Sequence, residues 1–343
     1  MKNGRSLLAL PFPDCYTLLQ MIRSFDLRDM PLVRRLTENG TPLHTESALV
    51  TGLHPLRSAL LSMVGGEFPT FVWKASGGKK AGFIQIQLEG NEHHAHILFL
   101  GAVNGKKQDN GSRESAVLED VWLSLLDTAV TEVGRRGIHS LVAEVSETGE
   151  ELPILRRAGF AVYTRQDIWV YEGEQAEKRP SPNILKPRQA NDDWDIQLLY
   201  ANTVPRLVQL VEPEPPLKHG EIWVLREAEE MTAFAHFHIG SEATWLRFFI
   251  HPNAETLADV MMQEAVQIIM AKTSRPIYCC VRRYQSWLQN PLQRAGFTYW
   301  GSQAVLVKRT VHQAQKPAQE LTAVLEAQGI TPSAPIIQRY RSK

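Results

Sequence analysis

The sequence predicts an α/β protein, of the α+β type with a mixed sheet, made of two tandem domains that each hold a central, mostly antiparallel sheet flanked by helices. Three observations predict this architecture. The chain contains an internal repeat, and the same order of strands and helices precedes both copies. Its length of 343 residues suits two domains of about 150 to 170 residues each.

The repeat is the clearest feature of the chain. The stretch LRRAGFAVYTRQDIWV begins at Leu155, and LQRAGFTYWGSQAVLV begins at Leu292. Seven of the 16 aligned positions are identical, at a constant separation of 137 residues. Self-similarity at one fixed spacing indicates a duplicated structural unit, so we expect the two stretches to occupy equivalent places in two similar domains.

A helix and then a strand precede each copy. Apolar residues recur at three- and four-residue steps from Leu118 to Val133 and from Leu257 to Ile269, which predicts two amphipathic helices. Short apolar runs at 141–145 and 277–281 predict the strands that follow them. Farther upstream, 68–103 and 220–252 each read as three antiparallel strands joined by turns.

These elements set the predicted boundaries. We expect an N-terminal extension at 1–20, domain 1 at 21–173, a polar linker with prolines at 174–183, domain 2 at 184–312, and a C-terminal helix and tail at 313–343.

Charge and composition exclude several classes of partner. The 37 Lys and Arg residues balance the 37 Asp and Glu residues, so no global field attracts nucleic acid or anionic lipid. No apolar run approaches the roughly 20 residues that span a bilayer. The three cysteines show neither disulfide nor metal-ligand spacing, which indicates a reducing compartment. We expect no nucleic-acid partner, no membrane partner and a cytoplasmic location, and the sequence carries no signal for an oligomeric state.

The order of elements, together with the segment GRRGIHSLVAEVSETGEELPILRRAGFAVYTRQDIWVYE from Gly134, resembles the GNAT fold, that of the GCN5-related N-acetyltransferases. The resemblance implies two tandem GNAT-like domains with degenerate motifs, each closed by a hairpin after the RAGF phrase. It also implies acetyl-CoA, or another acyl-CoA, as co-substrate, with a slot for its pantetheine arm between neighbouring strands. No metal is implied.

The resemblance assigns a cofactor loop in domain 1. The family writes this loop as Gln/Arg-x-x-Gly-x-Gly/Ala, and QDNGSR matches it with arginine in place of the last small residue. Glycines and free amides at a helix N-terminus suit a pyrophosphate. The implied cofactor-binding residues are Gln108, Asn110, Gly111, Ser112 and Arg113. The alternative is a solvated loop built on an Asn-Gly turn. The matching loop of domain 2, HPNAETLAD from His251, has no glycine and two acidic residues.

Two residues are candidates for catalysis. The family's general acid is a tyrosine four residues before the glycine of RAGF, and leucine stands there in both copies, at Leu155 and Leu292. Tyr163, on the following strand, is a possible substitute, and the alternative is a packing role. Glu144, a lone carboxylate in the apolar run LVAEV, is the candidate base, and the alternative is a salt bridge or an exposed strand face.

Two His-x-His pairs allow a metal-site hypothesis. His94 alternates with His96, and His236 alternates with His238. A metal site needs further ligands at a suitable spacing, and the sequence offers none with a telling spacing. We therefore predict polar strand faces here and no metal.

Two functions follow from these features. The first is an N-acyltransferase that moves an acyl group from acyl-CoA to a small-molecule or peptide amine, with domain 1 as the active unit and domain 2 degenerate. The alternative is a catalytically inactive tandem GNAT-fold protein with a ligand-binding or regulatory role.

Overall fold

The computed structural model describes residues 22–38, 40–75, 80–88, 94–104, 111–173, 183–212, 215 and 220–310. Both predicted terminal segments, 1–20 and 313–343, and nearly all of the predicted linker lie outside these ranges. Within them, no helix has the combination of length and apolarity that crossing a membrane requires.

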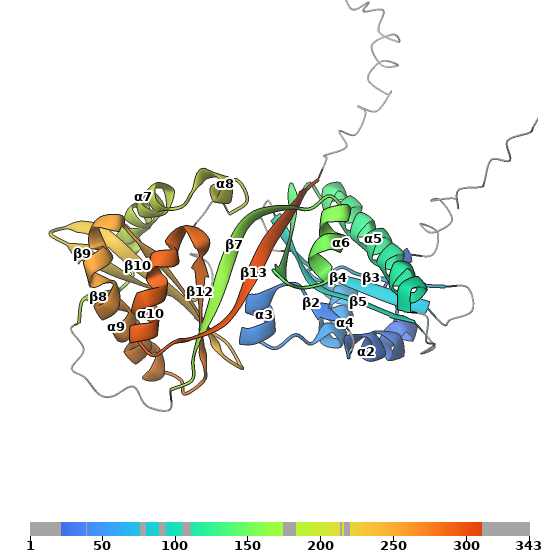
Figure 1. The fold of residues 1–343 in the computed structure, drawn as a ribbon, viewed down its shortest axis with the longest axis horizontal. Helices are drawn as coiled ribbons and strands as arrows, with labels where there is room; N and C mark the ends of the chain where they lie inside the picture. Colours follow the sequence, from blue (N-terminus) through green and yellow to red (C-terminus); the bar gives the residue numbers. More distant parts are fainter. Residues whose placement is uncertain are drawn as a thin grey trace, which may run out of the picture.

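One continuous sheet runs through the molecule from end to end (Figure 1). Domain 1 contributes β1 (Ile22–Ser24), β3 (Thr70–Lys74), β4 (Lys80–Leu88), β5 (His94–Asn104) and β6 (Ser140–Ser146). Domain 2 contributes β8 (Leu185–Pro187), β9 (Glu221–Glu227), β10 (Glu230–Ile239), β11 (Thr244–Ile250) and β12 (Ile277–Arg282). Two long strands, β7 (Ala161–Tyr171) and β13 (Thr298–Arg309), cross the centre between them. The short β2 (Thr41–Pro42) pairs with β5.

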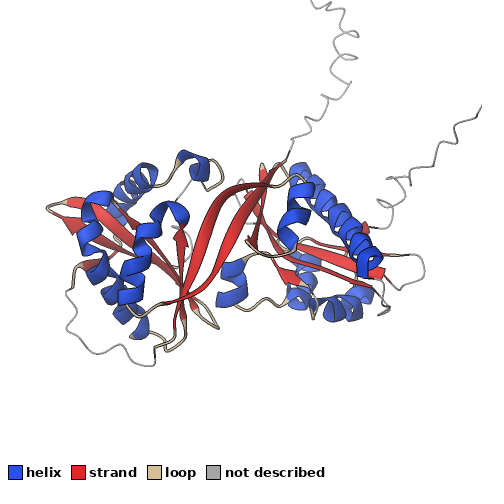
Figure 2. Ribbon diagram, in the orientation of Figure 1, coloured by secondary structure: helices blue, strands red, loops and turns tan. Residues whose placement is uncertain are grey.

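Helices cover both faces of the sheet in each domain (Figure 2). In domain 1 they are η1 (Leu27–Asp29), α2 (Met30–Thr37), α3 (Thr45–Val50), α4 (Pro55–Gly65), α5 (Gly111–Arg135) and α6 (Glu151–Arg157). In domain 2 they are η2 (Ala190–Asp192), α7 (Asp193–Thr203), α8 (Arg206–Gln209), η3 (Pro252–Leu257), α9 (Ala258–Met270), η4 (Arg283–Leu288) and α10 (Gln289–Arg294). The predicted mixed α/β architecture is confirmed, as are the strands and helices predicted before each copy of the repeat.

The RAGF phrase is a helix stop. Gly159 and Gly296 follow α6 and α10 with φ of +84° and +94°, in the left-handed region where glycine carries no steric cost. The next residue, Phe160 or Phe297, donates its amide to the carbonyl of Leu155 or Leu292 at 3.0 Å and buries its ring. The phrase therefore recurs because both units turn from a short helix into a strand in the same way.

The strand after each phrase completes the sheet of the other unit. β7 comes from domain 1 and pairs with β12 of domain 2, from Gln166 opposite Arg282 to Tyr171 opposite Ile277. β13 comes from domain 2 and pairs with β6 of domain 1, and its Leu306 lies in the core of domain 1. The predicted hairpin after each phrase is wrong, because each unit supplies one long strand that crosses over.

An approximate two-fold axis passes between the exchanged strands. β7 and β13 pair with each other, and Gln166 lies opposite Gln303. These residues are 137 residues apart, the spacing of the repeat, and the Nε2 of Gln166 donates to the Oε1 of Gln303 at 2.9 Å. The two residues that occupy the same position in the two copies are thus paired at the centre of the molecule.

Separating the two halves tests the exchange. When 1–173 and 174–343 are expressed separately, we expect neither to be a folded monomer, because β6 and β12 each lose their neighbour and expose an open edge. A full chain cleaved within the predicted linker is the control and should remain associated. Size-exclusion chromatography with light scattering checks both, and a folded monomer from either half would contradict the prediction.

Candidate functional site

β5 and β6 open into a wedge in domain 1. The two parallel strands pair at three positions, from His94 opposite Ser140 to His96 opposite Val142. Beyond these positions β5 continues to Asn104 and β6 to Ser146 without pairing to each other in the part of the chain that the structure describes. This wedge is the place where the family resemblance implies a pantetheine arm.

The chain itself fills the wedge. β2 runs antiparallel to β5, with Thr41 opposite Leu100. The next residue but one, Leu43, donates its amide to the carbonyl of Leu98 on β5 at 2.9 Å and accepts from the amide of Glu144 on β6 at 2.8 Å. Its side chain is 1% exposed, within the core under α5. Leu43 therefore bridges the two strands as an inserted strand residue would.

The Glu144 carboxylate binds the same segment. Its Oε2 accepts from the amide of Thr45, at the start of α3, at 2.8 Å, and the hydroxyl of Thr45 donates to Gln303 at 2.9 Å. The observed role of Glu144 is to hold α3 against the wedge. Its role as a catalytic base stays a prediction.

The predicted cofactor loop is described only in part. Gln108 and Asn110 lie outside the described residues. Gly111, Ser112 and Arg113 form the first residues of α5, where the structure describes the backbone but not the side chains. Their assignment to a pyrophosphate stays a prediction.

The corresponding turn of domain 2 uses its own polar groups. The amide of Asn253 donates to the Nδ1 of His251 at 3.2 Å, and the amide of Ala254 donates to the His251 carbonyl at 2.9 Å. In the first turn of α9, Asp259 accepts two hydrogen bonds from Arg294 at 2.8 and 2.9 Å. These amides and this carboxylate make the turn a poor cradle for an anion.

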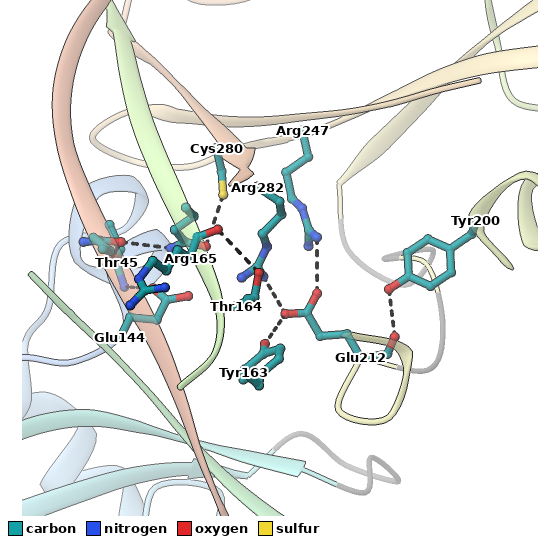
Figure 3. Close-up of polar contacts among 12 residues, drawn as sticks. Thr45, Glu144, Tyr163, Thr164, Arg165, Tyr200, Glu212, Arg247, Cys280 and Arg282 are labelled. Carbon is teal, nitrogen blue, oxygen red and sulfur yellow. Dashed lines mark hydrogen bonds and ion pairs between the residues drawn. The ribbon is translucent and has the colours of Figure 1, made fainter. Parts of the chain in front are cut away.

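Tyr163 lies in a buried polar cluster on the domain 2 side of the exchanged strands (Figure 3). It sits at a bulge in β7, between Val162 and Thr164 in the pairing with β13. Its hydroxyl donates to the Oε1 of Glu212 at 2.6 Å. The guanidinium of Arg282 donates to the same oxygen, and that of Arg247 donates to Oε2 at 3.3 Å.

The charges of the cluster fix its protonation. Burial alone would raise the pKa of Glu212, but the positive charges of Arg282 and Arg247, with the hydrogen bond from Tyr163, lower it to about 2. Burial and the adjacent carboxylate raise the pKa of Tyr163 well above its usual value. Tyr163 is thus a neutral phenol that donates its hydrogen bond to Glu212. Its role as a general acid stays a prediction.

A polar line connects the two sides of the axis. The Sγ of Cys280 donates to the Oε1 of Gln166 at 3.3 Å, Gln166 donates to Gln303, and Gln303 accepts from Thr45. Glu144 and Tyr163 lie on the strands on either side of β13, at the level of Val305, and share no hydrogen bond within the described part. The structure therefore brings both candidates to one polar centre without joining them.

Sequence reasoning missed most of this centre. The residues it missed are Thr45, Gln166, Glu212, Arg247, Arg282 and Gln303. Only the two glutamines carried a signal, as an identical position within the repeat. Leu155 and Leu292, at the family's tyrosine positions, are fully buried packing residues.

The histidine pairs lie on strands as predicted. His238 bonds to Glu46 of α3 through Nδ1 at 3.0 Å, which ties α3 to domain 2. The ring of His96 lies against that of His44, with centroids 4.5 Å apart and the ring planes tilted by 47°. Among the described residues, no three histidine, cysteine or carboxylate groups gather as ligands for a metal.

The fold was compared with those of known proteins. No family model matches the sequence, and no curated protein matches it. The structure of a GCN5-related N-acetyltransferase from Sphaerobacter thermophilus aligns with a TM-score of 0.50 at 10% identity, covering 86% of this chain and 98% of that one. The chain has the GNAT fold. An acetyltransferase of the GNAT family from Colwellia psychrerythraea aligns over 84% of this chain and 99% of that one, with a TM-score of 0.43 at 11% identity.

The GNAT fold occurs here as two tandem domains. The alignment with the Sphaerobacter protein extends over both of them, since it covers most of this chain. The domain boundaries given above stay predictions. At 10% identity this likeness shows the fold alone.

The lowered pKa of Glu212 predicts that the stability of the chain depends on pH. A carboxyl whose pKa falls from 4.5 to about 2 on folding contributes about 3 kcal/mol above pH 4.5, and this contribution is lost as the pH falls towards 2. We expect Glu212→Gln to lower the free energy of unfolding at pH 7 by about 3 kcal/mol or more, because two arginines lose their counter-charge. The variant should also lose less stability on acidification than the native chain.

Glu221→Gln is the matched control. Glu221 pairs with Lys272 at the surface, where the two side chains are 44% and 37% exposed, so its loss should cost less than about 1 kcal/mol. Urea unfolding of the three proteins at several pH values measures the effect. Equal costs for the two substitutions at pH 7 would show that the cluster does not stabilise the fold.

Proposed function

We propose that this protein is a catalytically inactive GNAT-fold binding or regulatory protein. The observation that supports it most directly is Leu43, which bridges β5 and β6 inside the wedge of domain 1. An acyl-CoA would need the same backbone groups and the same space. The segment from Thr41 to Thr45 would therefore compete with an acyl-CoA for the wedge.

Opening the wedge would cost free energy. Exposing the buried Leu43 side chain costs about 1.5 to 3 kcal/mol. Each of its two backbone hydrogen bonds contributes about 0.5 to 1.5 kcal/mol. The buried Glu144 carboxylate would also lose the Thr45 amide. These costs would be subtracted from the affinity of any ligand that displaced the segment.

The described turn of domain 2 also suits acyl-CoA poorly. The turn before α9 in domain 2 caps its own amides and carries acidic side chains, and leucine occupies the position of the family's acid in both units. The described residues of the wedge and of the domain 2 turn therefore do not fit an acyl-CoA in this conformation.

An acyltransferase is the second candidate, favoured by one observation. α5 begins at Gly111, shortly after β5, where the resemblance places the cofactor-binding helix. The co-substrate would be acetyl-CoA or another acyl-CoA, the acceptor an amine, and the site that of domain 1. This function requires the segment from Thr41 to Thr45 to leave the wedge. A cytoplasmic location and the absence of nucleic-acid or membrane partners stay predictions from the sequence for both candidates.

Thermal stability with acetyl-CoA separates the two candidates. We expect no stabilisation of the full chain at millimolar acetyl-CoA, because the wedge is filled. The acyltransferase predicts about 2.7 kcal/mol of stabilisation at one hundred times the dissociation constant. Stabilisation that Gly111→Asp abolishes and the matched Ala254→Asp in domain 2 preserves would refute the proposed function in favour of the second candidate.

The contribution of Leu43 to the free energy of unfolding can be measured separately. We expect Leu43→Ala to lower the free energy of unfolding by about 2 to 5 kcal/mol, because the side chain is enclosed and its loss leaves a cavity. Leu207→Ala, at a leucine that is 68% exposed on α8, is the control and should change little. Denaturant unfolding measures both. A loss below about 1 kcal/mol for Leu43→Ala would mean that the segment is loosely held, which would favour a displaceable gate.

A further inference from the structure

An open pocket lies beside the exchanged strands on the domain 1 side. It has a volume of about 540 Å³, and its lining includes Ser146, Glu147, Thr148, Tyr299, Trp300 and Ser302. Apart from Ser146, the last residue of β6, none of its lining residues belongs to the strands of the wedge or to the segment from Thr41 to Thr45, so the pocket lies outside the wedge.

The exchange of strands creates this pocket. β6 ends at Ser146, opposite Gln303 of β13. The part of β13 from Thr298 to Gly301 extends past that end and pairs with β7 on its other edge. The amide of Glu147 donates to the Ser302 carbonyl at 3.2 Å, just past the end of β6. The strand edge beyond this bond borders the pocket.

The pocket is the pseudo-symmetric counterpart of the Tyr163 cluster. Trp300 lies 137 residues after Tyr163, and both aromatic residues sit at register shifts between β7 and β13. Ser146 pairs with Gln303 as Arg282 pairs with Gln166. On the Tyr163 side, Glu212 occupies the space with its carboxylate, whereas on the Trp300 side the corresponding space is open.

The charges around the pocket are balanced. The carboxylate of Glu147 pairs with Arg165 at 2.6 Å and with Arg283 at 2.7 Å. Beneath Ser302, Asp167 accepts from the Ser302 hydroxyl and from the Nε2 of Gln289 at 2.9 Å. Two carboxylates thus face two guanidiniums. A charged ligand would lose hydration here without gaining a net opposite charge.

Aromatic faces and hydroxyl groups make up the rest of the lining. Tyr299 and Trp300 are 55% and 48% exposed. Trp169 supports the ring of Tyr299 edge-on at 5.7 Å, and Tyr278 supports that of Trp300 at 6.1 Å. The hydroxyls of Ser146 and Thr148 lie 3.2 Å apart, and the Tyr299 hydroxyl lies 2.7 Å from that of Ser302.

We propose that this pocket binds a neutral, polyhydroxylated ring, which is the chemistry of a carbohydrate. Such a ring presents apolar C–H groups that pack on aromatic side chains, and hydroxyls that both donate to and accept from serine, threonine and tyrosine hydroxyls. The proposal deepens the proposed binding function by naming its ligand class, and it rests on that function. The pocket is large enough to enclose much of a small sugar.

Titration of the full chain with neutral sugars tests the proposal. N-acetylglucosamine and cellobiose serve as probes, and saturation-transfer NMR gives the dissociation constants. We expect saturable binding of at least one of them and none of adenosine, a flat base, or glucosamine 6-phosphate, a charged sugar. Binding of neither sugar would overturn the proposal, and preferential binding of adenosine or of the charged sugar would overturn the ligand class.

Two variants locate the site. Trp300→Ala should weaken sugar binding at least about tenfold, whereas Trp194→Ala, at a tryptophan that is 72% exposed on α7, should leave it unchanged. A side chain added at Gly301 meets no atom within 4 Å, so Gly301→Leu should fold normally and fill the pocket. Unchanged sugar binding in Gly301→Leu would overturn the site even if Trp300→Ala fails to fold.

The two proposals fail separately. Acetyl-CoA stabilisation would refute the inactive, ligand-binding function and leave the sugar titration to be judged by its own variants. Absence of sugar binding, with acetyl-CoA also without effect, would remove only the carbohydrate pocket.

Discussion

The pairing of β7 with β13 is the constraint on which the rest of this structure depends. Each strand leaves its own unit and fills the gap beside the last strand of the other, so neither half has a complete sheet alone. The cores follow the exchange, since Leu306 is buried in domain 1 and Trp169 in domain 2. The hydrogen-bonded pair of Gln166 and Gln303 marks the point where both copies are in the same register.

The polar centre is a product of this exchange. Where a strand passes the end of its neighbour, it leaves an edge and a bulge, and this happens once on each side of the axis. On one side a carboxylate and two arginines occupy the space, and on the other a pocket remains. The duplication therefore kept the backbone arrangement while the two ends diverged in chemistry.

The helices, strands and turns of this chain could be predicted from the sequence, whereas the pairing of strands and residues that are distant in the sequence could not. The apolar stripe of α5 and the helix stop at Gly159 are encoded within a few residues, so pattern and turn chemistry reveal them. The β-branched and aromatic residues of Ala161–Tyr171 are typical of a strand, but they do not identify the strand that pairs with it. The hairpin implied by the family resemblance was therefore expected where the structure exchanges strands. The bond from Thr45 to Gln303 joins residues 258 positions apart. Nothing near Leu43 signals that it would bridge two strands, since Gly40, Pro42 and the polar residues around it are typical of a loop.

Gln166 and Gln303, which occupy the same position in the two copies, pair with each other as residues do across the axis of a symmetric dimer. If each half were a separate subunit, the same contact would be a symmetric dimer interface, with one strand donated in each direction and the glutamine facing its own copy. Placing both halves on one polypeptide replaces an association that depends on concentration with an intramolecular one. The two halves of one polypeptide can also differ in sequence. One end of the contact between them therefore carries arginines and a carboxylate, and the other carries a tryptophan and hydroxyl groups. Covalent linkage thereby permits an asymmetry that a homodimer could not encode.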